Sequence, residues 1–193
     1  MGNPGLKSLT TLRNLPVAAL LAALLLAPVA VRADPALIPG GGLRVAPTPI
    51  QLPTATRVVV RKAARRLELM RGNEVLGSYR ISLGLVPTGH KEKAGDFRTP
   101  EGRYQLARRN ARSDFFLSIQ VSYPGPGDLK RAKTNGWDPG GSIMIHGMPN
   151  RLKRDPDYYT GTDWTDGCIA VSNSDMVEIW LLTHDDTPID ILP

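Results

Sequence analysis

The sequence contains a single cysteine, Cys168, among its 193 residues. An internal disulfide needs two thiols, so none can cross-link this chain. Histidine is also scarce, with three residues in the chain. Cys168, His146 and His184 include no closely spaced chelating pair and no evident fourth ligand, so we discount a zinc site and expect no metal. An isolated cysteine is most often a small buried hydrophobe, and any other role has to be argued from its neighbours.

A strong excess of one charge is also missing. The formal net charge is +6, from 24 basic and 18 acidic residues. Lys7, Arg13 and Arg32 lie in the first 33 residues, and the remainder carries 21 basic and 18 acidic residues, or +3. This mild excess does not favour a nucleic-acid partner. It is compatible with work near an anionic cell-wall polymer or membrane surface.

No apolar run is long enough to be a clear membrane span. The longest covers residues 15–31, follows two basic residues and is interrupted by Pro16 and Pro28. A small-residue exit ends at Ala33. The pattern predicts a secretory signal peptide over residues 1–33 and a location in the periplasm or at the cell surface, with an uncleaved membrane anchor as the alternative. An exported free thiol is exposed to oxidation, so a cysteine kept only for packing is less expected there.

Internal repeats are absent, and the chain divides by composition. Residues 34–55 are rich in proline, glycine and alanine and lack apolar periodicity. This composition predicts a flexible linker of extended character. One domain, residues 56–193, is expected to follow it.

The pattern of residues 56–193 predicts mainly short strands separated by glycine and proline. Strands are expected at residues 57–61, 66–70, 75–85, 104–107, 115–121, 142–145 and 188–192. One helix is expected at residues 127–134. Another should begin at a Ser172 cap and turn apolar side chains toward the core, namely Met176, Val177, Ile179, Trp180 and Leu181. This spacing favours a mainly β sandwich or barrel with one or two short helices.

The residues before Cys168 suit a nucleophile. In Thr165-Asp166-Gly167-Cys168, the successive amides of Gly167 and Cys168 would form an oxyanion hole in a tight turn. The Thr165 hydroxyl could face the donor peptide. Asp166 opposes ionisation of the thiol unless it points to solvent or pairs with a cation.

His146 is the candidate general base. It ends the apolar run at residues 142–145, so a strand would deliver its imidazole rigidly, although a lone histidine there is often structural. Gly147 lets the backbone approach closely, and its carbonyl could fix the imidazole tautomer. We expect His90 and His184 on the solvated surface. Trp137 and Trp164, in loops rich in glycine and aspartate, could line a groove or pack the loops, and both interpretations stay open.

Three ordered motifs go beyond the cysteine. Residues 95–104 read Gly-Asp-Phe-Arg-Thr-Pro-Glu-Gly-Arg-Tyr, residues 139–147 surround the histidine, and residues 165–171 read Thr-Asp-Gly-Cys-Ile-Ala-Val. Together they resemble the L,D-transpeptidase catalytic domain of the YkuD type, with its G-D-x-x-T-P-x-G-x-Y region, histidine segment and S/T-x-G-C box. The resemblance covers residues 56–193.

The resemblance implies a mainly β fold with Cys168 as nucleophile, His146 as base, and Gly147, Thr165 and Gly167 in support. It also implies acyl transfer on the tetrapeptide stems of peptidoglycan, without a cofactor or a metal. The thiolate would attack the carbonyl at the L-centre of a diamino acid and release the terminal D-residue. The thioester would then pass to an amine or to water. We expect a monomer.

Two positions depart from the family's commonest pattern. Asp166 stands where histidine is frequent, and Ala170 stands where arginine or asparagine is usual. The box is similar to that of a YafK-like subgroup, some of whose members cleave wall linkages. The acceptor therefore stays open between an amine, a wall-linked protein and water. The alternatives are a hydrolase of the same fold, either an L,D-carboxypeptidase or an amidase that releases wall-bound protein, and a wall-binding module without turnover.

Overall fold

The computed structural model describes residues 51–193. The expected signal peptide and residues 34–50 of the expected linker lie outside the described residues. Ala55 is already buried, and its amide donates to the Leu182 carbonyl. Packing of the domain therefore includes the last residue assigned to the linker.

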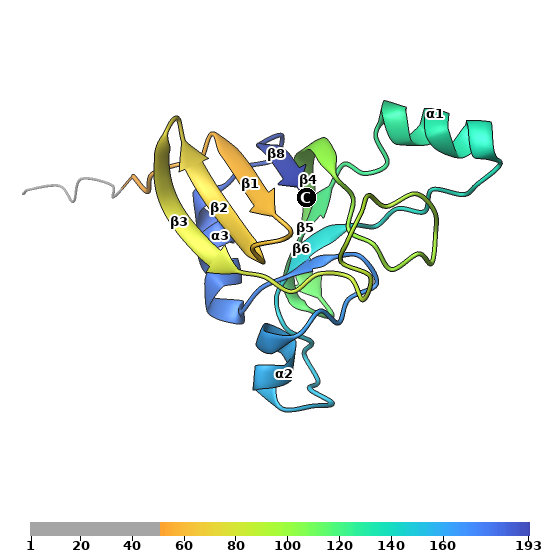
Figure 1. The fold of residues 1–193 in the computed structure, drawn as a ribbon. Helices are drawn as coiled ribbons and strands as arrows, with labels where there is room; N and C mark the ends of the chain where they lie inside the picture. Colours follow the sequence, from red (N-terminus) through yellow and green to blue (C-terminus); the bar gives the residue numbers. More distant parts are fainter. Residues whose placement is uncertain (1–50) are drawn as a thin grey trace, which may run out of the picture. The chain divides into compact units, whose positions relative to one another are not determined.

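Eight strands form one sheet in the order β3-β2-β1-β8-β4-β5-β6-β7. The strands are β1 (Arg57–Arg61), β2 (Arg66–Arg71), β3 (Glu74–Arg80), β4 (Gly102–Ser113), β5 (Phe116–Val121), β6 (Met144–His146), β7 (Ile169–Ala170) and β8 (Pro188–Leu192). The β1–β8 and β6–β7 pairs are parallel, and the other pairs are antiparallel. The mainly β fold is as the sequence predicts (Figure 1).

The centre of the sheet follows from its β-branched residues. Val58 and Val60 of β1 are fully buried, and Ile189 and Ile191 of β8 pack in the same core. Such residues suit a pleated, buried surface, and burying each side chain contributes about 1.5–3 kcal/mol. The alternation of β8, in which Pro188 and Leu192 are exposed, is the pattern of a strand with one face on the core.

Strand β4 joins the two halves of the sheet. It pairs with β8 through residues 102–105 and with β5 from Leu106 onward, where the register shifts twice. Extra residues of this kind bend a strand and increase its twist. The expected strand at residues 104–107 was too short, because these shifts let β4 continue to Ser113.

The segment after β3 closes the sheet against β7. The expected strand at residues 75–85 ends at Arg80. Beyond it, Ser82 pairs with Ala170 and Gly84 pairs with Thr165 as isolated bridges. These contacts link the two ends of the sheet order and bring residues 82–84 beside the segment that carries Cys168.

Three helices accompany the sheet, namely α1 (Pro126–Asn135), α2 (Pro156–Gly161) and α3 (Asn173–Leu182). Ser172 caps α3 as predicted, since its hydroxyl accepts from the Asp175 amide. Met176 and Ile179 are buried, but Val177 and Leu181 are exposed, so their expected packing in the core was wrong. Only one face of α3 meets the sheet.

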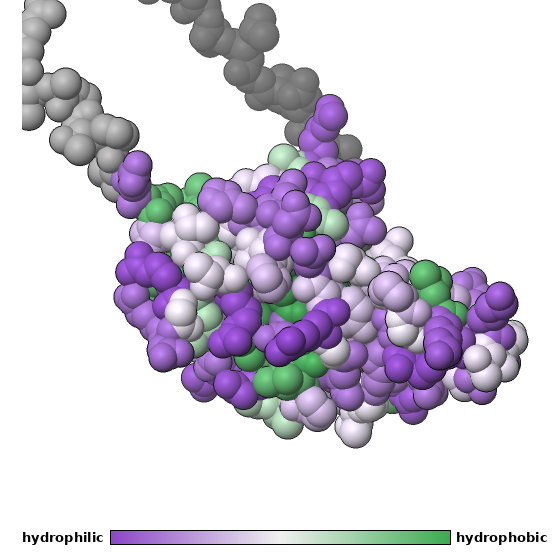
Figure 2. Space-filling view, turned by 90° about the horizontal axis from the view of Figure 1, so that it is seen from above, coloured by the Kyte–Doolittle hydropathy of each residue, from purple (hydrophilic) through white to green (hydrophobic). Residues whose placement is uncertain are grey.

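Helix α2 was not predicted. Its signal lies in Asp155-Pro156, a capping carboxylate followed by proline at the first helical position. Within residues 51–193 no helix is long and apolar enough to cross a membrane. The face of the domain seen from above is largely hydrophilic, with small hydrophobic areas (Figure 2).

Candidate active site

One cavity of about 510 Å³ contains both Cys168 and His146. Cys168 lies directly before β7, and His146 ends β6, the parallel neighbour of β7. The cavity wall also includes Thr165, Asp166 and Trp164. Gly147 and Gly167 are not among the lining residues. The fold thus brings together the proposed nucleophile and base from segments 22 residues apart.

The His146 imidazole is fixed in one tautomer. Its Nδ1 lies 2.7 Å from the Gly147 carbonyl oxygen. A carbonyl only accepts, so Nδ1 carries the proton and Nε2 keeps its lone pair. The side chain is buried, and this burial lowers the pKa of His146 to about 4, although the bond to Gly147 opposes the shift. Near neutral pH the imidazole is therefore an uncharged base.

Two aromatic rings hold the imidazole in place. The Phe115 ring centroid lies 4.6 Å from that of His146, and the Trp164 ring meets the imidazole edge-on at 5.6 Å. Both rings line the cavity, and the Trp164 indole donates to the Tyr159 carbonyl. Trp164 therefore forms part of the groove wall, while Trp137 lies beside Lys93 and is not among the cavity's lining residues. The contact of Phe115 with His146 has no periodic signal in the sequence.

Cys168 rests as a protonated thiol. Its Sγ lies 3.6 Å from the Ser142 carbonyl oxygen, which can only accept a proton. Burial raises the pKa of the Cys168 thiol, and the Asp166 carboxylate raises it further, whereas the Met144 amide and Lys91 act in the opposite direction. Asp166 is exposed and forms no ion pair within residues 51–193. The thiol and imidazole are thus both neutral.

The Thr165 hydroxyl organises the nucleophile turn. It donates to the Cys168 carbonyl at 2.7 Å and accepts from the Gly167 amide at 3.1 Å. The Gly167 amide is therefore already engaged, which corrects its assignment to an oxyanion hole. Thr165 is buried and turned toward this backbone rather than toward a donor peptide. Within the described residues the Cys168 amide has no hydrogen-bond partner, so it is the donor of this turn that remains for an oxyanion.

Gly147 and Gly167 are required by close packing. A Cβ on Gly167 would lie 2.6 Å from the Arg98 carbonyl oxygen, and its φ of +128° disfavours any side chain. A Cβ on Gly147 would lie 2.5 Å from Asn173 Oδ1, which accepts from the Met148 amide. The two glycines let the backbone carrying Cys168 and His146 approach neighbouring segments.

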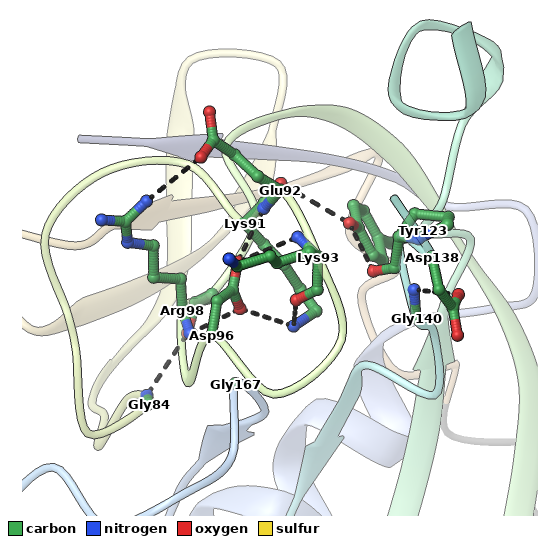
Figure 3. Close-up of polar contacts among 12 residues, drawn as sticks. Gly84, Lys91, Glu92, Lys93, Asp96, Arg98, Tyr123, Asp138, Gly140 and Gly167 are labelled. Carbon is green, nitrogen blue, oxygen red and sulfur yellow. Dashed lines mark hydrogen bonds and ion pairs between the residues drawn. The ribbon is translucent and has the colours of Figure 1, made fainter. Parts of the chain in front are cut away.

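Residues 84–99 form a loop that supports the nucleophile turn. Asp96 lies at its centre, accepting from the Lys91 ammonium at 2.7 Å and from backbone amides that include those of Glu92 and Arg98 (Figure 3). Burial alone would raise its pKa, but the ammonium and the amides lower the pKa of Asp96 to about 2. Gly84 begins this loop and pairs with Thr165. A Cβ on Gly84 would overlap the Phe97 carbonyl and lie 3.1 Å from Gly167 Cα, so the two ends of the loop pack tightly beside the nucleophile turn.

A second buried ammonium anchors the same loop to the sheet. Lys62 follows β1, is 2% exposed, and donates to the carbonyls of Gly89 and Thr99 and to the Glu101 carboxylate. All three of its protons therefore have acceptors. This role could not be predicted from the sequence, because lysine at the end of a strand usually projects into solvent.

The remaining residues named from the sequence, His90, His184 and Ala170, differ in how well their surroundings match the expectation. His90 is not solvated as expected, because its Nδ1 accepts from the Glu101 amide and its Nε2 lies 3.1 Å from the Asp128 carboxylate. His184 is exposed, as expected. Ala170 is buried, and it pairs with His146 of β6 and, through an isolated bridge, with Ser82. Within residues 51–193 no group of three or more potential ligands could hold a metal.

A cysteine and a tautomer-fixed histidine in one cavity of a curved β sheet define a candidate cysteine acyltransferase or hydrolase. The particular family is given by comparison with known proteins. Residues 55–191 match the model of the YkuD family, described as the L,D-transpeptidase catalytic domain. The chain therefore belongs to this family.

Individual relatives agree with this assignment. The chain is 32% identical over 109 residues to YafK of Escherichia coli K12, an alignment covering 55% of this chain and 37% of YafK. Two crystal structures of the helical cell shape determining protein Pgp2 from Campylobacter jejuni, the K307A mutant and the unmutated protein, are 25% identical, with TM-scores of 0.53 and 0.52. Each alignment covers 70% of this chain and 46% of Pgp2. The aligned region thus spans less than half of these relatives.

Proposed function

We propose that this protein is a cysteine-dependent L,D-transpeptidase acting on the stem tetrapeptides of peptidoglycan. The observation that carries the proposal is the cavity of about 510 Å³ that Cys168 and His146 both line, together with the bond to Gly147 that leaves the His146 Nε2 lone pair free. Membership of the YkuD family supports the substrate class. Similarity to Pgp2, a cell shape determining protein, supports a role in wall remodelling.

Because the Cys168 thiol and the His146 imidazole are both neutral at rest, proton transfer accompanies the attack on the substrate. As Sγ attacks the carbonyl carbon at the L-centre of the diamino acid, the thiol proton passes to His146 Nε2. The Gly147 carbonyl stabilises the imidazolium through Nδ1–H. The tetrahedral oxyanion is met by the Cys168 amide, the donor of the turn that is not otherwise bonded. His146 then returns the proton to the departing amine of the D-residue, which leaves a thioester on Cys168.

In the second step an acceptor attacks the thioester. The amine attacks as its free base, after an ammonium form has lost one proton to solvent. His146, neutral again, takes a proton from the attacking amine or water and passes it to the Cys168 thiolate as the thioester bond breaks. An amine acceptor on another stem gives a cross-link, an amine on a wall-linked protein gives attachment, and water gives a shortened stem. Asp114 and Asp166 line the cavity, and these carboxylates favour a cationic amine over neutral water as the group drawn to it. We therefore place transfer to an amine first and hydrolysis second.

We further propose that the protein acts as a monomer in the periplasm or at the cell surface, after export by the signal peptide expected at residues 1–33. The peptidoglycan substrate lies outside the cytoplasm, so catalysis requires export. Sequencing the N-terminus of the protein recovered from cells tests this directly. We expect the mature chain to begin at Asp34, and a mature protein retaining residues 1–33 in the cytoplasm would contradict the assignment.

Mass analysis of wall fragments tests the reaction. Purified protein and Cys168→Ala are incubated with disaccharide tetrapeptides, and the products are separated by liquid chromatography. We expect cross-linked dimers and free terminal D-residue with the wild type and neither with Cys168→Ala. Shortened stems without dimers would assign hydrolysis instead, and unchanged fragments together with binding would indicate a wall-binding module.

A further inference from the structure

A second cavity adjoins the catalytic one. It has a volume of about 320 Å³ and is lined by Arg108, Arg109, Asn110, Ser118 and Met144. Three of these residues, Asn110, Ser118 and Met144, also line the cavity that contains Cys168. The two spaces therefore lie side by side along β4, β5 and β6 and share part of their wall, and together they are called the groove.

The sheet register places this cavity in line with the catalytic base. Asn110 pairs with Ser118, and Ser118 pairs with His146, so the three side chains form a row on one face of the sheet. Neighbouring strands lie about 4.8 Å apart, which puts the Asn110 backbone about 10 Å from that of His146. A diamino acid side chain, with a run of five carbon–carbon bonds about 6 Å long, is shorter than this separation, so the long Arg108 side chain must extend along the groove to meet its end.

The two arginines of this cavity differ in how they are bonded. The Arg109 guanidinium donates to the Trp180 and Thr183 carbonyls and to the Asp185 carboxylate, which fixes it on α3. Arg108 is exposed, and its guanidinium has no hydrogen bond or ion pair within residues 51–193. Arg108 is thus the cation available to a ligand in the groove.

The charges of the groove are divided between its two parts. The catalytic cavity contains two carboxylates, Asp114 and Asp166, and no arginine or lysine among its lining residues. An anionic group on a substrate would be repelled there and attracted to Arg108. The groove also offers neutral polar groups, since Asn110 accepts from the Arg112 amide through Oδ1 and keeps its NH₂ donor, and Ser118 adds a hydroxyl.

We propose that Arg108, assisted by Asn110 and Ser118, forms a carboxylate-binding subsite that selects the stem peptide. The inference rests on the proposed function. A guanidinium binds a carboxylate through two parallel hydrogen bonds, which gives both attraction and orientation. A stem tetrapeptide has two carboxylates that fit this chemistry, one on the side chain of the diamino acid and one at the C-terminus of the leaving D-residue.

Steady-state kinetics with three synthetic tetrapeptides tests the subsite and identifies its ligand. One peptide is unmodified, one is amidated at the side-chain carboxylate, and one is amidated at the C-terminus. The full chain is compared with Arg108→Ala and Arg108→Lys. Arg103→Ala is the matched control, because Arg103 lies on the same strand, is 90% exposed in its side chain and lines neither cavity.

We expect one of the two amidations to lower kcat/KM of the wild type about 10- to 100-fold, mostly through KM. Arg108→Ala lowers kcat/KM for the unmodified peptide to a similar extent and removes the difference between it and that amide. Arg108→Lys keeps part of the preference, and Arg103→Ala behaves as the wild type. The amidation whose effect disappears in Arg108→Ala identifies the carboxylate.

An Arg108→Ala enzyme that keeps the full preference for the free carboxylate would overturn the subsite and leave the proposed function intact. Equal turnover of all three peptides by the wild type would do the same. A wild type that turns over none of them would overturn the proposed function itself, and the subsite with it. The two failures are thereby distinguished.

Discussion

His146 and Cys168 differ from the thiolate–imidazolium pair found at many activated cysteines. Burial disfavours charge on both side chains, lowering the pKa of His146 to about 4 and raising that of Cys168. The Ser142 carbonyl accepts from the thiol, and the Gly147 carbonyl accepts from the imidazole. The nucleophile is therefore formed only as the substrate is attacked, when the proton moves to Nε2.

Alkylation of the free thiol by iodoacetamide tests this resting state. Since only the thiolate reacts, a pKa above the ordinary value of about 8.5 makes the rate constant rise at least about 25-fold between pH 7 and pH 9. Asp166→Asn should move the profile to lower pH, while Asp157→Asn, on α2 and away from the cavity, should not. A fast rate that is constant from pH 6 to pH 9 would contradict the neutral pair.

The buried imidazole also makes stability depend on pH. His146 titrates near pH 4 when folded and near 6.5 when unfolded, so the unfolded chain binds more protons between these values. The contribution of the neutral His146 to the unfolding free energy is fully present above pH 6.5. It falls by up to about 3 kcal/mol as the pH drops to about 4. Urea denaturation at several pH values measures this loss. His146→Gln should lack this component, and His184→Gln should retain it; an equal decline in His146→Gln would refute the assignment.

At the scale of elements, the nucleophile turn depends on backbone contacts with the loop at residues 84–99. Gly167 lies against the Arg98 carbonyl, and Gly84 lies against that of Phe97. The Thr165 hydroxyl then fixes the turn from within. Both ends of this loop thus meet the nucleophile turn without side chains between them, which explains why glycine is needed at both positions.

Gly167→Ala tests this packing. The new Cβ would lie 2.6 Å from the Arg98 carbonyl oxygen at a φ of +128°, so either the turn or the loop must move. We expect a loss of about 2–4 kcal/mol in unfolding free energy and at least a tenfold loss of kcat/KM. Gly127→Ala, in α1 with nothing within 4 Å of the added Cβ, should change neither quantity adversely. Wild-type behaviour of Gly167→Ala would show that the contact is dispensable.

At the scale of the whole molecule, much of the fold could be predicted from local patterns. The β-branched run at residues 57–61, the alternation at residues 188–192 and the Ser172 cap all predicted their elements. Strand β4 extends further than its apolar pattern, because register shifts and pairing with two partners decide its length. Strand β7 has two residues and depends on its parallel pairing with β6, which no local pattern encodes.

The candidate site also has features that could be predicted from local sequence and features that could not. Cys168 and His146 could be chosen from their flanking glycines and motifs. The engagement of the Gly167 amide by Thr165 and the packing of Phe115 on His146 could not, since both depend on the folded geometry. The burial of Lys62 was also hidden, because its three acceptors come from residues 27 to 39 positions away.

Lys62→Met tests how far the sheet and the catalytic loop depend on each other. Removing the ammonium leaves the Gly89 and Thr99 carbonyls and the Glu101 carboxylate without their donor. We expect a loss of about 3–5 kcal/mol in unfolding free energy, measured by urea denaturation, because a buried charge pair is broken on one side. Arg61→Met, at the neighbouring exposed position, should cost less than about 1 kcal/mol. Similar values for the two variants would show that Lys62 does not anchor the loop.

During turnover, Cys168 should carry the stem peptide as a thioester. Acid-quenched mass spectrometry of the intact protein, followed by peptide mapping, measures this most directly after brief incubation with a disaccharide tetrapeptide. We predict one adduct, with the mass of the disaccharide tripeptide acyl group, on the peptide containing Cys168, and none on Cys168→Ala. Continued turnover by Cys168→Ala, or an adduct on a different residue, would contradict a thioester on Cys168.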